Sequence, residues 1–123
     1  DIARQYDAAF ADLKTVKPLA VRPDVSHAYH LYVIALAPDR LRVKRDAVFA
    51  ALRAEGIGVN VHYVPVHLHP FYRKRFGTGP GDCPIAEAAY ERIVSLPIFP
   101  AMTDRDADDV IAAVRKVMQA YAA

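Results

Sequence analysis

Cysteines are scarce in this sequence, and it has neither a long apolar run nor a visible signal peptide. It holds a single cysteine, Cys83, so no disulfide can form within the chain, which fits a reducing compartment such as the cytoplasm. The longest apolar run, residues 31–37, is far shorter than the ~20 residues of a membrane-spanning helix. No signal peptide is visible, so we expect a cytoplasmic protein with no membrane partner.

Neither sign of charge dominates the sequence. The 16 lysines and arginines are nearly matched by 14 aspartates and glutamates, which leaves a net charge of +2. A balance of this kind provides no strong attraction to nucleic acid or to a membrane surface. The sequence also contains no Walker motif, no GxSxG, no CxxC and no dinucleotide-binding fingerprint, so none of these chemistries is indicated.

The chain does contain enough apolar sequence for one folded domain. Hydrophobic residues make up 54% of the 123 residues, which excludes disorder by composition. The clearest helix is 103–121, where Thr103 and Asp106 form a capping-box pair ahead of an apolar stripe. Helical spacing and stop signals predict further helices over residues 1–14, 43–55, 70–76 and 83–94.

Three strands are predicted between these helices. Residues 30–36 are apolar on both alternating faces, which is typical of a central strand covered on both sides. In 57–62 apolar and polar residues alternate, which predicts a strand with His62 on its less apolar face, and 95–99 forms a short third strand. The order predicts a two-layer α/β (α+β) domain with helices covering a small sheet of about three strands.

Residues 60–75 are the richest in chemical groups and hold three of the five histidines. His62, His67 and His69 could form a zinc site, but no carboxylate lies among them, and we predict no metal. The basic run 73–75 could bind an anion, although a solvated turn is the simpler interpretation of that run alone. His62 could serve as a general acid or base, or be a hydrogen-bonded sheet histidine, and the residues leave both open.

Three separated blocks of the sequence resemble a known family. They are HAYHLYVIAL, RDAVFAALRAEGIGVNVHYVPVHLHPFY and GDCPIAEAAYERIVSLPIFPAMTDRDADDVIAAV, and together they cover most of residues 27–114. In this order they resemble the C-terminal third of the sugar aminotransferases grouped with DegT, DnrJ and StrS. The resemblance implies the C-terminal small domain of a fold-type-I enzyme that depends on pyridoxal 5′-phosphate (PLP). It also implies that residues 1–24 are a linker helix and loop from a large domain, and that 25–123 form the small domain.

The resemblance implies a function for the longer enzyme. Such enzymes are homodimers that transfer an amino group, typically from L-glutamate, to a nucleotide-linked 4-keto-6-deoxy sugar for cell-surface polysaccharides. The blocks look most like the transaminases that form UDP-4-amino-4,6-dideoxy-N-acetyl-altrosamine. The PLP-binding lysine lies in the family's large domain, and no lysine here stands in such a motif, so we expect this fragment alone to be inactive. An alternative is a stand-alone, non-catalytic module that either binds sugar nucleotides or has a regulatory role.

The resemblance also implies which residues meet the substrate. His62 is implied to face the cofactor or the sugar, as an active-site contact, while no catalytic lysine is present. Tyr63 is implied to lie beside His62, and His30 near the cleft. The residues implied to line the sugar-nucleotide channel are His67, Tyr72 and Arg73. The implied substrate-binding residues are His30, His62, Tyr63, His67, Tyr72 and Arg73.

Overall fold

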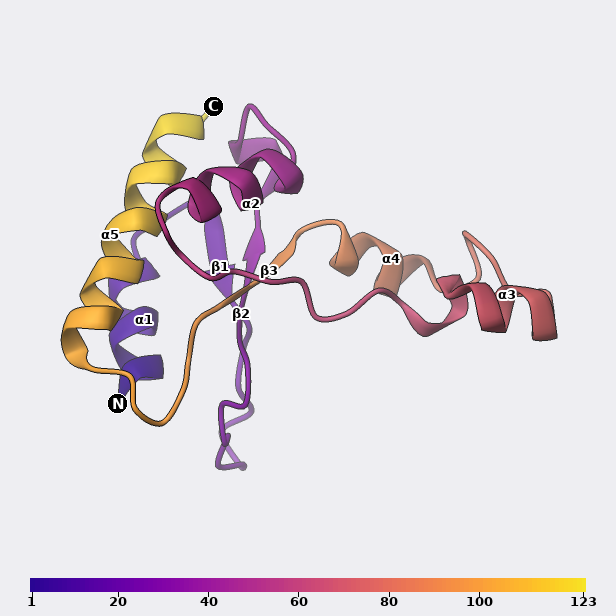
Figure 1. Cartoon of the computed structure of the whole chain (residues 1–123), viewed down its shortest axis with the longest axis horizontal. Helices are drawn as coiled ribbons and strands as arrows, with labels where there is room; N and C mark the ends of the chain where they lie inside the picture. The colour runs from indigo at the N-terminus through magenta and orange to yellow at the C-terminus, as the bar shows by residue number, and fades with distance from the viewer.

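Three antiparallel strands, in the order β1-β2-β3, lie at the centre of the computed structural model, which describes residues 1–123 (Figure 1). Five α-helices accompany them, so the predicted α+β class with a three-stranded sheet is confirmed. The elements are α1 (Ile2–Phe10), β1 (Val16–Pro18), β2 (Tyr32–Leu36), α2 (Arg45–Ala54), α3 (Pro70–Phe76), α4 (Pro84–Tyr90), β3 (Ile93–Leu96) and α5 (Asp104–Tyr121), with 3₁₀ turns η1 (Pro38–Arg40) and η2 (Val66–Leu68). None of the helices is both long enough and apolar enough to pass through a bilayer.

Strand β2 is central, as predicted, but only one face of it is fully covered. Tyr32, Ile34 and Leu36 are buried, whereas the alternate residues Val33 and Ala35 are only partly buried. The reason is that the 21-residue core cluster, to which α1, α2 and α5 all contribute, takes in only one face of β2. The prediction that this strand is covered on both sides is therefore wrong for the chain as it stands.

The N-terminal segment is part of this core. Tyr6 and Phe10 of α1 are almost completely buried, and the Tyr6 hydroxyl donates to the Pro97 carbonyl at 2.9 Å. Helix α1 ends at Phe10, four residues before the predicted end, and the chain then forms β1, where a loop was predicted. Three residues that include Pro18 carry no alternation from which a strand could be predicted, and only the pairing with β2 reveals it.

Two other predicted boundaries need correction. Residues 57–62 do not form a strand: Ile57 and Val59 are buried, but Asn60 alone pairs with β3, through two main-chain hydrogen bonds with Ser95 of 2.8 and 3.1 Å. Helix α4 ends at Tyr90 rather than residue 94, and β3 begins at Ile93, because Val94 and Leu96 reach the core from the strand's inner face.

Helix α5 follows the prediction closely. Thr103 and Asp106 form a complete capping box, in which the Asp106 amide donates to Thr103 Oγ1 and the Thr103 amide donates to the Asp106 carboxylate. The predicted apolar stripe is confirmed for the buried residues Val110, Val114, Val117 and Met118. The box satisfies amide groups that the first turn of a helix would otherwise leave unpaired.

We expect Thr103→Ala to lower the free energy of unfolding by about 1 kcal/mol, because it removes the side-chain cap of the longest helix. Urea unfolding followed by circular dichroism measures the change. Thr103→Ser keeps the acceptor oxygen and should stay close to the parent chain. An equal loss in both variants would show that the methyl group, rather than the cap, carries the effect.

Residues 61–92 leave the body as a projecting arm that carries α3 and α4 (Figure 1). The helix predicted over 70–76 is confirmed, and Gly77, with a φ of +71°, ends it in the left-handed conformation that glycine adopts readily. None of the arm's residues is buried. Its large exposed apolar side chains are Tyr63, Val64, Val66, Phe71, Tyr72, Phe76 and Ile85.

Candidate functional site

Two of the predicted site residues, His30 and His62, line the same cavity, which measures about 520 Å³. It opens where residues 58–62 run beside β3, close to the root of the arm. The volume lies within the range of small-molecule sites. The lining residues are His30, Leu31, Gly58, Asn60, His62, Ser95, Leu96, Pro97, Ile98 and Phe99.

His62 is held by a side chain of the sheet. Its Nδ1 lies 2.9 Å from Oγ of Ser95, which is buried on the β3 face opposite to the core. The main-chain pairing of Asn60 with the same serine fixes the backbone two residues earlier. No group of the chain forms a hydrogen bond with Nε2 of His62. The hypothesis of a hydrogen-bonded sheet histidine thus describes the Nδ1 contact, while the acid–base role of His62 stays a prediction for a residue that also lines a cavity.

His30 lies where the long β1–β2 connection returns to the sheet. It lines the His62 cavity and also a second one, of about 380 Å³, formed by that connection. Nearby, the His27 ring lies edge-on against Tyr29, whose amide donates to His27 Nδ1 at 3.0 Å. His30 is therefore an exposed residue that lines both cavities, one of them shared with His62.

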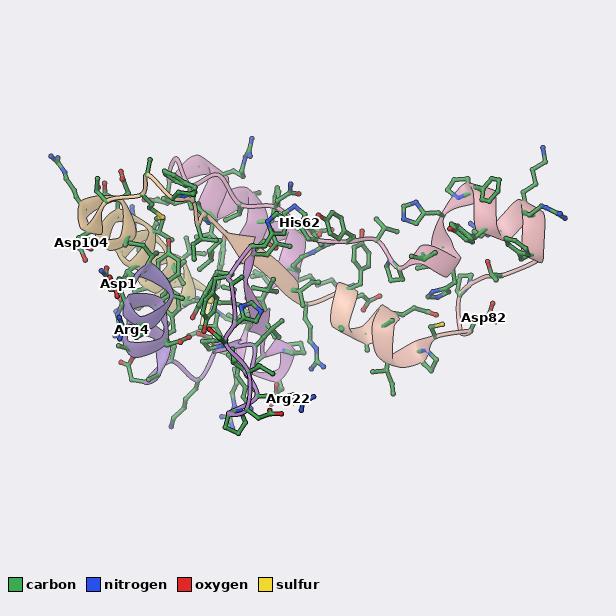
Figure 2. The ribbon with its side chains drawn as sticks, turned by 90° about the horizontal axis from the view of Figure 1, so that it is seen from below. Asp1, Arg4, Arg22, His62, Asp82 and Asp104 are labelled. Atoms are coloured by element: carbon green, nitrogen blue, oxygen red, sulfur yellow. The ribbon has the colours of Figure 1, made fainter.

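The other predicted site residues belong to the arm and do not join this cavity. Tyr63 follows His62 directly and is 67% exposed. Tyr72 stacks on Phe76 at 6.0 Å between ring centroids, within α3, which also carries Arg73. Figure 2 shows His62 at the root of the arm and Asp82 far out along it. The structure thus divides the predicted residues into a group at the root and a group on the arm.

His67 is turned toward another part of the arm. Its Nε2 lies 2.8 Å from Oε1 of Glu87, and its side chain is only 10% exposed. This hydrogen bond, together with those from the Gly81 and Cys83 amides, holds the pKa of the Glu87 carboxyl below its ordinary value. The His67 imidazole is therefore already engaged within the chain.

Sequence reasoning missed Ser95 and Glu87. Ser95 is the one polar residue in the run Ile93–Leu96, and a polar residue inside an apolar strand is a signal that could have been used. Glu87 lies 20 residues after His67, and only the fold brings the two together. A partner this distant in sequence leaves no local pattern.

The three histidines of residues 60–75 form hydrogen bonds with three different partners. His62 bonds to Ser95, His67 to Glu87, and His69 Nε2 lies 3.2 Å from the Val64 carbonyl oxygen. No three His, Cys, Asp or Glu side chains come together as ligands for a metal ion. The arrangement gives the zinc hypothesis no support.

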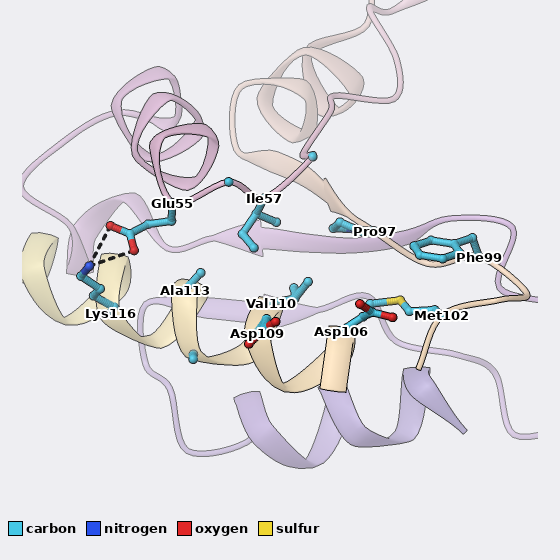
Figure 3. Close-up of a pocket in the computed structure, with 13 residues that line it drawn as sticks. Glu55, Ile57, Pro97, Phe99, Met102, Asp106, Asp109, Val110, Ala113 and Lys116 are labelled. Carbon is cyan, nitrogen blue, oxygen red and sulfur yellow. Dashed lines mark hydrogen bonds and ion pairs between the residues drawn. The ribbon is translucent and has the colours of Figure 1, made fainter. Parts of the chain in front are cut away.

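A neighbouring cavity of about 470 Å³ lies between α5 and the segment after α2 (Figure 3). It shares Gly58, Pro97 and Phe99 with the His62 cavity. Its one lysine, Lys116, is bound to both oxygens of Glu55 at 2.8 and 2.9 Å. No lysine lines the His62 cavity, so the residues there do not supply an amine to hold PLP covalently.

The DegT/DnrJ/EryC1/StrS aminotransferase family matches residues 1–115 of the chain. The chain belongs to this family. It is 42% identical over 120 residues to the spore coat polysaccharide biosynthesis protein SpsC of Bacillus subtilis, a match that takes in 97% of this chain and 31% of SpsC. The chain therefore spans about a third of the length of the relatives that it matches.

Solved structures agree with the family. The putative sugar aminotransferase Spr1654 of Streptococcus pneumoniae superimposes with a TM-score of 0.85 and 30% identity, over 98% of this chain and 30% of that one. Helicobacter pylori PseC, an aminotransferase involved in the biosynthesis of pseudoaminic acid, gives 0.85 and 25%, over 98% and 32%. Spr1654 has been solved in PLP, PMP and apo forms, which indicates PLP dependence in the family.

Proposed function

We propose that this chain is the small domain of a PLP-dependent aminotransferase that acts on a nucleotide-linked 4-keto-6-deoxy sugar. The family match over residues 1–115 carries the proposal. Residues 25–123 would form the small domain, and residues 1–24 would come from the connection to a large domain. When bound, PLP accepts and donates the amino group, and its lysine would come from that large domain. The 123-residue chain alone would then be inactive.

His62 is the residue best placed to act on the substrate. Its Nδ1 is held by Ser95, its Nε2 has no partner in the chain and the residue lines the cavity, so we propose that it holds or moves one proton there. His30 lines the same cavity, and Tyr63, the exposed residue that follows His62, would lie beside it. Tyr72 and Arg73 would extend the substrate side along the arm, where the nucleotide of the sugar substrate would lie. His67, which the resemblance implies as a further contact, is hydrogen-bonded to Glu87 beside them.

The substrate class follows from the resemblance and from the relatives. PseC is an aminotransferase of pseudoaminic acid biosynthesis, and SpsC takes part in spore coat polysaccharide biosynthesis. We therefore favour the UDP-linked keto sugar that yields 4-amino-4,6-dideoxy-N-acetyl-altrosamine, with L-glutamate as the amino donor. A product used in cell-surface polysaccharides would be made by a cytoplasmic enzyme, where nucleotide sugars are formed.

The exposed arm supports an enzyme larger than this chain. Its apolar side chains include Phe71 at 66% exposure and Ile85 at 87%. Burying such area is favourable by about 25 cal/mol per Å², so a surface of this kind is normally covered. The large domain and the second subunit of a homodimer are the surfaces that would cover it.

The decisive experiment is the intact mass of the native, untruncated gene product before and after borohydride reduction. We expect a mass about three times that of this chain, with one pyridoxyl group fixed to a lysine outside residues 1–123. A native mass equal to that of this chain, with no cofactor, would instead support the stand-alone binding module and would withdraw the catalytic role of His62.

A further inference from the structure

The arm holds its shape through one polar centre. Glu87 of α4 accepts hydrogen bonds from His67 Nε2 at 2.8 Å, from the Gly81 amide at 2.9 and 3.0 Å, and from the Cys83 amide at 3.2 Å. The side chains of His67 and Glu87 are 10% and 22% exposed. These two are therefore well shielded on an arm whose aromatic side chains are largely exposed.

His67 is fixed through its main chain as well as its ring. The Thr78 hydroxyl donates to the His67 carbonyl oxygen at 2.8 Å. The two contacts tie η2 both to the loop after α3 and to the start of α4, and so close the chain segment 67–87, which contains α3. Because no residue of the arm is buried, these polar bonds replace the apolar core that would normally hold such a segment.

From this geometry we propose that His67 is a positioning residue. Together with Glu87 it forms an arm clamp that places α3, and with it Tyr72 and Arg73, and it does not itself contact the substrate. Its Nε2 is already hydrogen-bonded to Glu87, and its side chain is only 10% exposed. The effect of the clamp on turnover rests on the proposed function, whereas its effect on the shape of the arm does not.

The arm carries its own reporter for the clamp. Arg73, Lys74 and Arg75 are consecutive trypsin sites inside the closed segment. In His67→Ala and in Glu87→Ala we expect trypsin to cleave there about tenfold faster than in the parent chain, because cleavage follows local opening and a charge-assisted hydrogen bond is lost. The double variant should cleave no faster than Glu87→Ala, which already removes the bonds from His67, Gly81 and Cys83.

Two control variants distinguish loss of the arm clamp from a general loss of stability of the arm. His69→Ala removes a histidine two residues away whose one bond, to Val64, is long, and its cleavage rate should match the parent chain. Glu87→Gln keeps an acceptor oxygen and should lie between the parent and Glu87→Ala. Parental cleavage rates in both His67→Ala and Glu87→Ala would overturn the clamp.

Kinetics of the full-length enzyme distinguish positioning from direct contact. If His67 only positions the arm, His67→Ala and Glu87→Ala should both raise KM for the nucleotide sugar, Glu87→Ala by at least as much as His67→Ala, and leave kcat nearly unchanged. A rise in KM for His67→Ala alone would make His67 a ligand and overturn its positioning role. If the full-length protein shows no aminotransferase activity, the proposed function fails, while the trypsin result still decides the clamp.

Discussion

Replacing His62 with alanine in the full-length enzyme should lower kcat about 100-fold, the scale expected when a positioned acid or base is lost. The expectation rests on the geometry of the cavity, where Ser95 holds Nδ1 at 2.9 Å and leaves Nε2 without a partner in the chain. Steady-state transamination of the nucleotide-linked keto sugar, with kcat and KM determined separately, measures the effect. A fall in kcat with little change in KM would indicate that His62 acts in the chemical step.

Two variants serve as controls for His62. His69→Ala removes another histidine of the same segment, which lines no part of the His62 cavity, and should leave kcat unchanged. Ser95→Ala removes the group that holds the imidazole, so its kcat should fall by less than that of His62→Ala. Parental kinetics in His62→Ala would remove His62 from the site.

Replacing Phe10 with alanine should destabilise the isolated chain by about 3–5 kcal/mol, the usual cost of truncating a buried aromatic side chain. Phe10 is 1% exposed and stacks on Tyr6 at 5.8 Å between ring centroids, in the core shared by α1 and α5. Urea unfolding of the two chains measures the difference. A domain of this size is normally stable by about 5–15 kcal/mol, so this loss is a large share of the total.

The matched control for Phe10 is Leu19→Ala. Leu19 lies in the same N-terminal region, just after β1, but is 55% exposed, so its loss should cost less than 1 kcal/mol. A small cost for Phe10→Ala as well would mean that α1 contributes little to the fold and would favour treating residues 1–24 as a simple linker.

Sequence patterns predicted those elements whose stabilising contacts lie within one short segment of the chain. Helix α5 was found because an apolar stripe and the Thr103–Asp106 capping box lie within one continuous segment. The alternation in 57–62 misled because any extended segment along the edge of a core buries every second residue, whether or not it pairs as a strand. Ile57 and Val59 are buried in this way, yet only Asn60 forms ladder bonds.

In the candidate site, too, sequence identified individual residues but not the partners that lie far from them in the chain. The resemblance singled out His30 and His62, and the fold places both on one cavity. Ser95, which orients His62, could not be paired with it from sequence because 33 residues separate them. Composition likewise could not show that the arm lies outside the core, because its aromatic residues look like core residues until their exposure is known.

The arm has a consequence for how this chain can vary. The cluster of 21 buried residues that holds the body together includes none from residues 61–92. The body of this chain should therefore fold whatever residue stands at Phe71 or Arg73, so positions at the tip of the arm can be varied together as a library and scored for binding rather than for folding.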